Sequence, residues 1–435
     1  MKKNILPNML LLCGSLGLMF LLTEAALHVA VQPSRYSAGI LFDRELPPYK
    51  LLPETPSFPS GNRPEWYQQV VVDGQQITAG DMCGIYREDS LLGYAPRENA
   101  VSVNGWWQSN NIGARAREAT APEKSTGKNR LLVFGESFGQ GSRVRQEESW
   151  TAILDAEQEA LEVVNLAVDG YSMAQAYLRY RTLRRQIDYD AVLMMFVPRE
   201  DLWRDVNIRR DLGEAWWGTY LSMPRFILED SALKLIRPFP LPETYRSGSF
   251  DPDLLEQLQR HLRAYDRFYD PALCEMSGLP GQSILYKLLR LKWYQRDWNR
   301  QRQALLKPGS EALQVSREIF ARMKADAEED GKRFYLAILP VGYELKQNDY
   351  FPSVQKFYNR IAAEFTAAGI DCFNLLEELS QVPPSEIDNG YDGSHYGPRA
   401  NRRIAGLIAA HLADSGLLMP SKDSSRGTVA GVKAP

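Results

Sequence analysis

Cysteine and histidine are scarce in this chain, with four of each among 435 residues. The cysteines stand at positions 13, 83, 274 and 372, and this spacing matches no metal-ligand pattern. We therefore expect no metal and no other cofactor. Only Cys83, Cys274 and Cys372 lie beyond the apolar N-terminus, and in an exported protein they could form one disulfide, but the sequence does not choose the pair. The alternative is that they are small buried hydrophobic residues.

An excess of positive charge is also lacking. The chain has 51 Lys and Arg against 54 Asp and Glu, a formal net charge of −3. This balance gives no general attraction to polyanions, so nucleic acid is not expected as a partner. Hydrophobic content of 44% and charged content of 24% are ordinary for a globular protein. The length allows one large domain with insertions, or two domains.

The N-terminus carries a long apolar stretch. Lys2-Lys3 precedes the apolar run Met9–Leu22, and apolar character resumes over Ala25–Val31. Residues 1–32 are predicted to be an uncleaved anchor that crosses a membrane once, with the rest of the chain in the periplasm or outside the cell. A cleaved signal peptide is the alternative. Because a carboxylate is expensive in lipid, we expect the anchor to end before Glu24 and to continue as a stalk.

Beyond the anchor, the pattern changes along the chain. Residues 33–127 form an extension that is rich in proline at first and then predicts short strands with turns. From residue 128, continuous apolar strands alternate with amphipathic helices, which predicts a parallel sheet covered on both faces. Strands are expected at 130–134, 163–168, 191–197, 334–339 and 371–375, and helices at 149–161, 174–187, 311–329, 354–367 and 398–412.

A large insertion separates the third and fourth strands. Residues 203–309 are too many for a crossover, so they are predicted to be a lid over the strand ends that sets substrate size. Its aromatic residues, such as Trp216 and Trp217, either line a cleft or form the insertion's own core. Its last helix, at 284–303, has a basic face that is either solvated or meets anionic lipid or acidic glycan. Residues 417–435 are predicted to be disordered.

Two segments carry the chemistry. Ser137 lies in Gly135-Glu136-Ser137-Phe138-Gly139, directly after an apolar strand, and Asp392-Gly393-Ser394-His395 places an acid three residues before an imidazole. A serine on a strand-to-helix turn, with an acid and a base brought back by the fold, is typical of nucleophilic acyl transfer. The alternatives are that Ser137 only caps the following helix and that His395 is a surface histidine.

Three blocks resemble the SGNH/GDSL hydrolase superfamily, in the family's order. Residues 132–141 resemble the first block, with its Gly-Asp-Ser nucleophile, 165–172 the second, and 392–395 the fifth. The resemblance implies a flavodoxin-like three-layer α/β/α sandwich over residues 128–202 and 310–416. It also implies Ser137 as nucleophile, His395 as base and Asp392 as its orienting acid. The backbone N–H groups of Ser137 and Gly170 would form the oxyanion hole.

The chain departs from this family at two positions. Glu136 stands where the family has aspartate, and Arg199-Glu200-Asp201 follows the third strand where the family has Asn-Asp. Glu200 takes the place of an asparagine amide that donates to the oxyanion, and a lost donor costs about 10²–10³ in rate. Arg199 could supply positive charge instead, or a local shift could restore a donor.

A further stretch, Asn110-Asn111-Ile112-Gly113-Ala114-Arg115, resembles one found upstream of the catalytic block in membrane-anchored relatives. It is interpreted as a turn that fixes conformation, with substrate contact as the alternative. The expected function is that of a membrane-anchored esterase acting on acyl esters, O-acetyl esters included, of an envelope or extracellular carbohydrate. The alternatives are an O-acyltransferase acting on a polysaccharide and a catalytically impaired carbohydrate-binding protein.

Overall fold

The computed structural model describes residues 5–34, 37–52, 69–72, 75–78, 85–102, 105–208, 222–240, 251–346 and 349–418. The chain divides into two compact units. The first comprises Met1–Gly61, Val206–Ser222 and Pro238–Ala304, and the second comprises Asn62–Asp205, Met223–Arg237 and Leu305–Pro435. The segment 203–309 is thus shared between the units, and its role as a lid stays a prediction.

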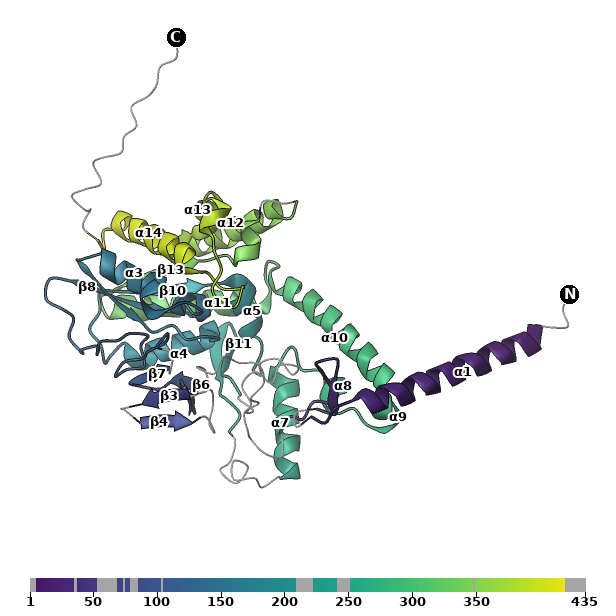
Figure 1. The fold of residues 1–435 in the computed structure, drawn as a ribbon. Coiled ribbons are helices and arrows are strands. Elements are labelled where there is room, and N and C mark those ends of the chain that lie inside the picture. Colours follow the sequence, from purple (N-terminus) through teal and green to yellow (C-terminus); the bar gives the residue numbers. More distant parts are fainter. Residues whose placement is uncertain are drawn as a thin grey trace, which may run out of the picture. The chain divides into compact units, whose positions relative to one another are not determined.

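A five-stranded parallel sheet forms the centre of the second unit (Figure 1). Its strands run in the order β9-β8-β10-β13-β14, which is 2-1-3-4-5 when they are numbered along the chain. This is the flavodoxin-like order, and it confirms the predicted fold class. The strands are β8 (Asn129–Phe134), β9 (Leu161–Asn165), β10 (Ala191–Phe196), β13 (Arg333–Ile338) and β14 (Asp371–Asn374).

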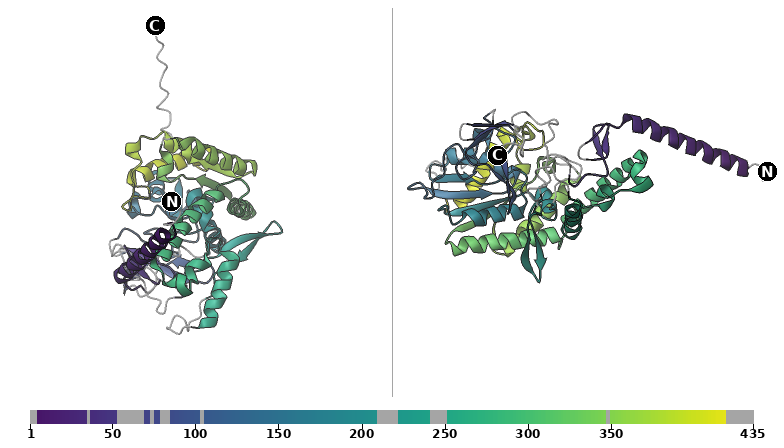
Figure 2. Two further views of the ribbon diagram at one scale, coloured as in Figure 1. Left: turned by 90° about the vertical axis from the view of Figure 1, so that its right-hand side faces the viewer. Right: turned by 90° about the horizontal axis from the view of Figure 1, so that it is seen from below.

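Helices cover both faces of this sheet, as Figures 1 and 2 show. On one face lie α3 (Trp150–Glu157), α13 (Leu375–Ser380) and α14 (Pro398–Asp414). On the other face lie α4 (Met173–Leu183), α11 (Glu311–Glu329) and α12 (Phe351–Ala367). Because helices cover both faces of the sheet, the side chains on both faces of each strand are shielded from solvent. This explains why the strands are continuous apolar runs in the sequence.

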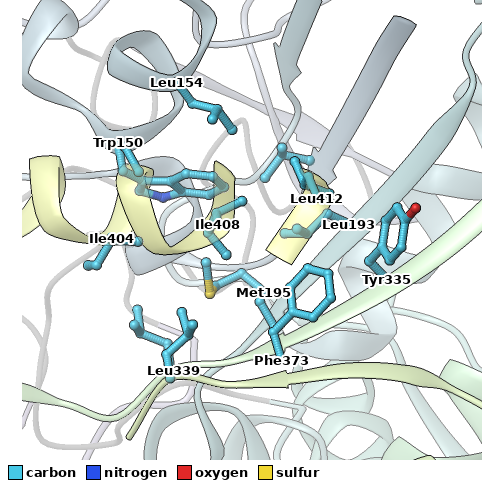
Figure 3. Close-up of a cluster of buried hydrophobic side chains, with 14 of the residues drawn as sticks. Trp150, Leu154, Leu193, Met195, Tyr335, Leu339, Phe373, Ile404, Ile408 and Leu412 are labelled. Carbon is cyan, nitrogen blue, oxygen red and sulfur yellow. The ribbon is translucent and has the colours of Figure 1, made fainter. Parts of the chain in front are cut away.

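Figure 3 shows the core on the first of these faces. Trp150 of α3 and Ile408 of α14 pack over Met195 of β10, and all three side chains are fully buried. On the opposite face, Phe196 of β10 meets Phe320 of α11 edge-on, with ring centroids 5.2 Å apart. The sheet is therefore held between two apolar layers, which fixes the carboxyl ends of its strands.

The predicted short strands of the extension are present in the second unit. An antiparallel sheet contains β3 (Gln69–Val72), β4 (Gln75–Thr78) and β7 (Ala100–Ser102), and a hairpin contains β5 (Tyr86–Asp89) and β6 (Gly93–Pro96). Two short helices follow central strands: α2 (Ser137–Gln140) after β8 and α5 (Pro198–Arg204) after β10. A second hairpin pairs β11 (Arg225–Glu229) with β12 (Ala232–Ile236). Single 3₁₀ turns occur at Gln146–Glu148, Gly342–Leu345 and Pro384–Glu386.

The first unit begins with the apolar helix α1 (Ile5–Ala30). Its segment Pro7–Ala30 has a mean hydropathy of 2.0 and is only 6% buried, so it is long and apolar enough to cross a membrane. A signal sequence has the same properties. The helix continues past Glu24 without a break. The other elements are β1 (Gly39–Leu41), β2 (Arg44–Leu46), α7 (Pro252–Tyr265), α8 (Pro271–Cys274), α9 (Gly278–Gln282) and α10 (Ile284–Leu305).

Some predictions fall outside the described residues. These concern the tail from residue 419, Trp216 and Trp217, and Cys83. Within the described ranges, Cys13 and Cys372 are free thiols.

Candidate active site

The turn that holds Ser137 depends on a glycine. Gly135 follows β8 with φ +145°, and a Cβ there would lie 2.8 Å from the carbonyl oxygen of Met195. The chain therefore turns close against β10 and enters α2. Glu136 caps this helix, since its Oε1 accepts a hydrogen bond of 2.8 Å from the amide of Phe138. Ser137 is thereby held at the carboxyl end of β8, where ligands bind in such sheets.

The structure brings the three predicted catalytic residues into contact. Nε2 of His395 lies 2.8 Å from Oγ of Ser137, and its Nδ1 lies 2.6 Å from Oδ2 of Asp392. The ring of Phe138 stacks on the imidazole at a centroid distance of 4.7 Å. A base thus bridges a hydroxyl and an acid, which is the geometry for removing the hydroxyl proton.

Asp392 is held as a carboxylate by its own loop. Its Oδ1 accepts from the amides of Ser394 and His395 at 3.0 and 3.1 Å, and its Oδ2 accepts from the Ser394 hydroxyl at 2.7 Å. Burial by itself would raise the pKa of Asp392, but the hydrogen bonds from His395 and Ser394 outweigh it and hold this pKa well below its usual range. The acid therefore stays ionised beside the imidazole.

Arg143 connects the catalytic acid to the second block. Its Nη1 lies 2.8 Å from Oδ2 of Asp169, and its Nε lies 3.4 Å from Oδ2 of Asp392. Asp169 directly precedes Gly170, which has a φ of +77°. The guanidinium side chain is 15% exposed, so these ion pairs are shielded from solvent. Arg143 thus fixes the loop that contains Gly170 relative to the acid.

A buried charged cluster lies behind the nucleophile. Glu136 is fully buried, and its Oε2 lies 2.5 Å from Oγ of Ser137 and 3.5 Å from Nη1 of Arg204. Arg204 Nη1 also lies 3.7 Å from Oδ1 of Asp201, another fully buried acid. Burial raises the pKa of Glu136 against the opposing charge of Arg204, and burial with the nearby Glu136 raises that of Asp201 well above its usual value.

Arg199 and Glu200, the two residues of the third block considered for the oxyanion hole, contact other side chains. Nε of Arg199 donates to Glu344 at 2.7 Å, and its Nη2 donates to the hydroxyl of Tyr350 at 2.6 Å. The carboxylate of Glu200 accepts from Arg204 at 3.3 Å. Neither contact involves Ser137, and the part of either residue in an oxyanion hole stays a prediction.

The upstream motif supports the loop that follows the nucleophile. The Asn110 side chain accepts from the amides of Ile112 and Ala114 at 3.2 and 3.1 Å. Arg115 is 4% exposed and donates to the carbonyl oxygens of Gln140 and Val144 at 2.9 and 2.8 Å. These are bonds to backbone, so the stretch holds a conformation.

Sequence reasoning missed Arg143, Arg204 and the hydrogen bond between Glu136 and Ser137. The i, i+4 spacing of Glu200 and Arg204 was the one available signal for Arg204. No local signal marked Arg143, because its partner Asp392 is far away along the chain.

Comparisons with known proteins find similar folds. No protein-family model and no curated protein matches the chain. Among solved structures, it is similar to a member of the lipolytic protein G-D-S-L family from Veillonella parvula DSM 2008, at 11% identity and a TM-score of 0.30, over 65% of this chain and 96% of that one. It is also similar to a lipase/acylhydrolase from Enterococcus faecalis, at 12% identity and a TM-score of 0.32, over 68% and 99%.

A third solved structure, an acetyl xylan esterase, is 10% identical with a TM-score of 0.33, over 65% of this chain and 98% of that one.

Proposed function

We propose that this protein is a membrane-anchored serine esterase of the SGNH type. Its substrates would be acyl esters, O-acetyl esters included, of an envelope or extracellular carbohydrate. The observation that carries this proposal is the continuous relay from Ser137 through His395 to Asp392 at the carboxyl edge of the sheet. Such a relay serves to activate a serine, and a helix-capping serine would need no imidazole.

The reaction would proceed in two halves. Ser137 Oγ attacks the ester carbonyl while His395 Nε2 takes its proton, and the alkoxide leaving group then receives that proton. The acyl group is now bound to Ser137 as an ester. Water, deprotonated by His395, attacks this acyl-enzyme and releases the acid. Asp392 accepts a hydrogen bond from Nδ1–H of the imidazole, so Nε2 has no proton and can act as the base in both half-reactions.

Two backbone amides would bind the oxyanion. Ser137 is the first residue of α2, whose first amides have no partner within the helix. Gly170 supplies the second amide from a left-handed turn, and Arg143 holds the preceding residue, Asp169, through an ion pair. Amide donors held in place before the reaction stabilise the charge that develops in the transition state.

An aromatic pair beside the acid supports a carbohydrate substrate. Tyr391 directly precedes Asp392, is 43% exposed, and meets the ring of Trp106 edge-on at 5.7 Å. The guanidinium of Arg145 lies over the Trp106 ring at 5.5 Å. Tyr391 is exposed and Trp106 is partly exposed, and aromatic rings next to a reactive centre suit the apolar faces of sugar rings. We therefore assign Trp106 and Tyr391 to sugar binding.

The proposed location follows from α1 and the charges before it. Lys2-Lys3 precedes the apolar helix, so the lysines would stay in the cytoplasm and the catalytic unit would lie outside it. The membrane is then the protein's permanent partner, and its substrates are the acylated glycans or small esters of that compartment.

The test uses the full chain in detergent with p-nitrophenyl acetate. The wild type should release acetate, and Ser137→Ala should reduce the rate to background, while Ser142→Ala serves as a matched control on the same loop. A fluorophosphonate should label Ser137. No label on folded protein would favour the carbohydrate-binding alternative, and acetylated sugar formed in preference to acetate from an acetyl donor and an oligosaccharide would favour the transferase.

The substrate class has its own test. Trp106→Ala and Tyr391→Ala should raise KM for an acetylated oligosaccharide by about tenfold or more, the effect of roughly 1.4 kcal/mol. Turnover of p-nitrophenyl acetate should stay unchanged. Equal effects on both substrates would remove these rings from sugar recognition.

A further inference from the structure

The carboxylate of Glu24, near the end of α1, caps the start of α10. Its side chain is 11% exposed and accepts hydrogen bonds from the amides of Ile284 and Leu285 at 2.8 and 3.0 Å, and one from the Ser283 hydroxyl. The first amides of a helix have no partner within it and favour an anion. A residue of the apolar helix thus completes a helix formed far later in the chain.

Apolar contacts also join the end of α1 to the start of α10, beside the hydrogen bonds of Glu24; we call this region the junction. Leu27 and Val31, beyond Glu24, pack against the cluster of Leu41, Leu46 and Ile284. The part of α1 before Glu24 exposes its large side chains. From Ile5 to Thr23 the helix is about 28 Å long at 1.5 Å per residue, which is close to the ~30 Å of a bilayer core. Removal of α1 by a signal peptidase would leave the amides of Ile284 and Leu285 without this acceptor.

A stripe of exposed residues runs along α10. Leu289, Trp293, Arg296 and Arg300 follow one another at intervals of three or four residues, and Lys292 lies four residues before Arg296. The five residues therefore share one face of the helix, and all five are exposed. Leu289 is 42% and Trp293 50% exposed. Large apolar side chains among Lys and Arg are typical of helices that lie in the membrane interface.

We propose that α1 is retained in the mature protein and that this stripe of α10 rests on anionic phospholipid headgroups where α1 leaves the membrane. The proposal rests on the membrane anchor proposed above and is independent of the esterase activity. In Figure 1, α10 leaves the end of α1 at a wide angle to the axis of α1. A helix that starts at the end of a membrane span and turns away from the axis of that span runs along the surface of the bilayer.

Charge and apolarity together select lipid over glycan. Lys292, Arg296 and Arg300 match an anionic leaflet, in which each basic residue strengthens binding by about fivefold. An acidic glycan would match the same charges but would leave Leu289 and Trp293 in water. The acyl boundary below the headgroups takes up both side chains.

The experiment reconstitutes the full chain into vesicles of phosphatidylcholine alone or with phosphatidylglycerol at 7:3, with and without brominated acyl chains. The difference in tryptophan quenching between wild type and Trp293→Phe isolates Trp293. This difference should be larger with phosphatidylglycerol. The triple variant Lys292→Gln/Arg296→Gln/Arg300→Gln should lower the ratio of bound to free α10 by about 100-fold, to the level in phosphatidylcholine.

A matched variant removes the same charge from α11: Arg317→Gln/Arg322→Gln/Lys324→Gln should leave the quenching unchanged. A mature protein whose intact mass lacks α1 would overturn retention. Equal quenching in both vesicle types, or equal effects of the two triple variants, would overturn the headgroup contact. Protection of Trp293 by a soluble acidic oligosaccharide alone would assign the stripe to glycan. Hydrolysis of p-nitrophenyl acetate, measured in parallel, reports separately on the esterase.

Discussion

The carboxyl group of Glu136 competes with His395 for the proton of the nucleophile. Ser137 Oγ lies 2.5 Å from Glu136 Oε2 and 2.8 Å from His395 Nε2, but the hydroxyl has one proton. In one arrangement a neutral Glu136 donates to Ser137, which donates to a neutral His395. In the other, an ionised Glu136 accepts from Ser137, and a protonated His395 donates to it. Both hold the same number of protons, and only the first leaves His395 able to act as a base.

Burial decides between these arrangements. Glu136 is fully buried, and this burial raises its pKa, while Arg204 at 3.5 Å acts in the opposite direction. Glutamine at position 136 can reproduce only the first arrangement, because its carbonyl still accepts from Phe138 and its amide donates to Ser137. We expect kcat/KM of Glu136→Gln for p-nitrophenyl acetate to stay within about tenfold of wild type, or about 1.4 kcal/mol.

Alanine at the same position should behave differently. Glu136→Ala leaves the amide of Phe138 without its acceptor, and a buried donor left unpaired costs about 1–3 kcal/mol. It also removes one of the acids beside Arg204. The variant should unfold at lower temperature than Glu136→Gln, as measured by circular dichroism. This comparison separates the hydrogen bond of the cap from the charge of the acid.

The pH profile gives the sharpest readout. As the pH rises through the raised pKa of Glu136, the wild type loses the shared proton, and the carboxylate then competes with His395 for the serine hydroxyl. Wild-type kcat/KM should therefore fall on the alkaline side, and Glu136→Gln, which cannot ionise, should lack this fall. A loss beyond about 10³ in folded Glu136→Gln, approaching the rate of Ser137→Ala, would refute the reasoning, because the charge would then be needed for catalysis.

Three further substitutions test the surroundings of the site. Asp392→Asn should lower kcat by about 10⁴, because an amide facing Nδ1 leaves the wrong nitrogen of His395 as the base; p-nitrophenyl acetate turnover measures it. Burial raises the pKa of Asp205 to about 6, so the stability it contributes is present below pH 4 and is lost as the pH rises to about 6. Urea unfolding should show a loss of about 3 kcal/mol over this range that Asp205→Asn lacks. Glu200→Gln should change kcat by less than about tenfold, because Arg204 already neutralises this carboxylate; a gain of about 10² would show that it faces the oxyanion.

The sheet could be predicted from sequence because its burial leaves a clear pattern. All six residues of β10 are fully buried, so the strand reads as an unbroken apolar run. Amphipathic helices between such strands leave few other arrangements. The prediction for α11, residues 311–329, agrees with the structure at both ends. The second strand is shorter than expected: β9 ends at Asn165, whose side chain turns to bind Gln140 and Thr151, and this contact is not visible in an apolar pattern.

Contacts between distant parts of the chain could not be predicted in the same way. The junction of Glu24 with Ser283 joins residues that no periodicity relates, so the sequence showed only an unfavourable carboxylate in an apolar helix. The ion pair of Arg143 could not be predicted for the same reason, since its partner Asp392 lies in the last loop before α14. A charged residue is interpreted as solvated unless its partner is known, and that partner is a property of the fold.

At the third block, the surroundings of Glu200 in the structure differ from those that its position in the sequence suggests. By position alone, Glu200 replaces an amide donor with a negative charge beside the oxyanion. In the structure, Arg204 lies 3.3 Å from that carboxylate and also 3.5 Å from the carboxyl group of Glu136. One guanidinium group thus interacts with more than one acid near Ser137. The repulsion expected from the sequence is thereby reduced, and the guanidinium of Arg199 donates to Glu344. An oxyanion hole of two backbone amides then predicts an esterase that is slower than one with three donors by about 10²–10³, yet still dependent on Ser137.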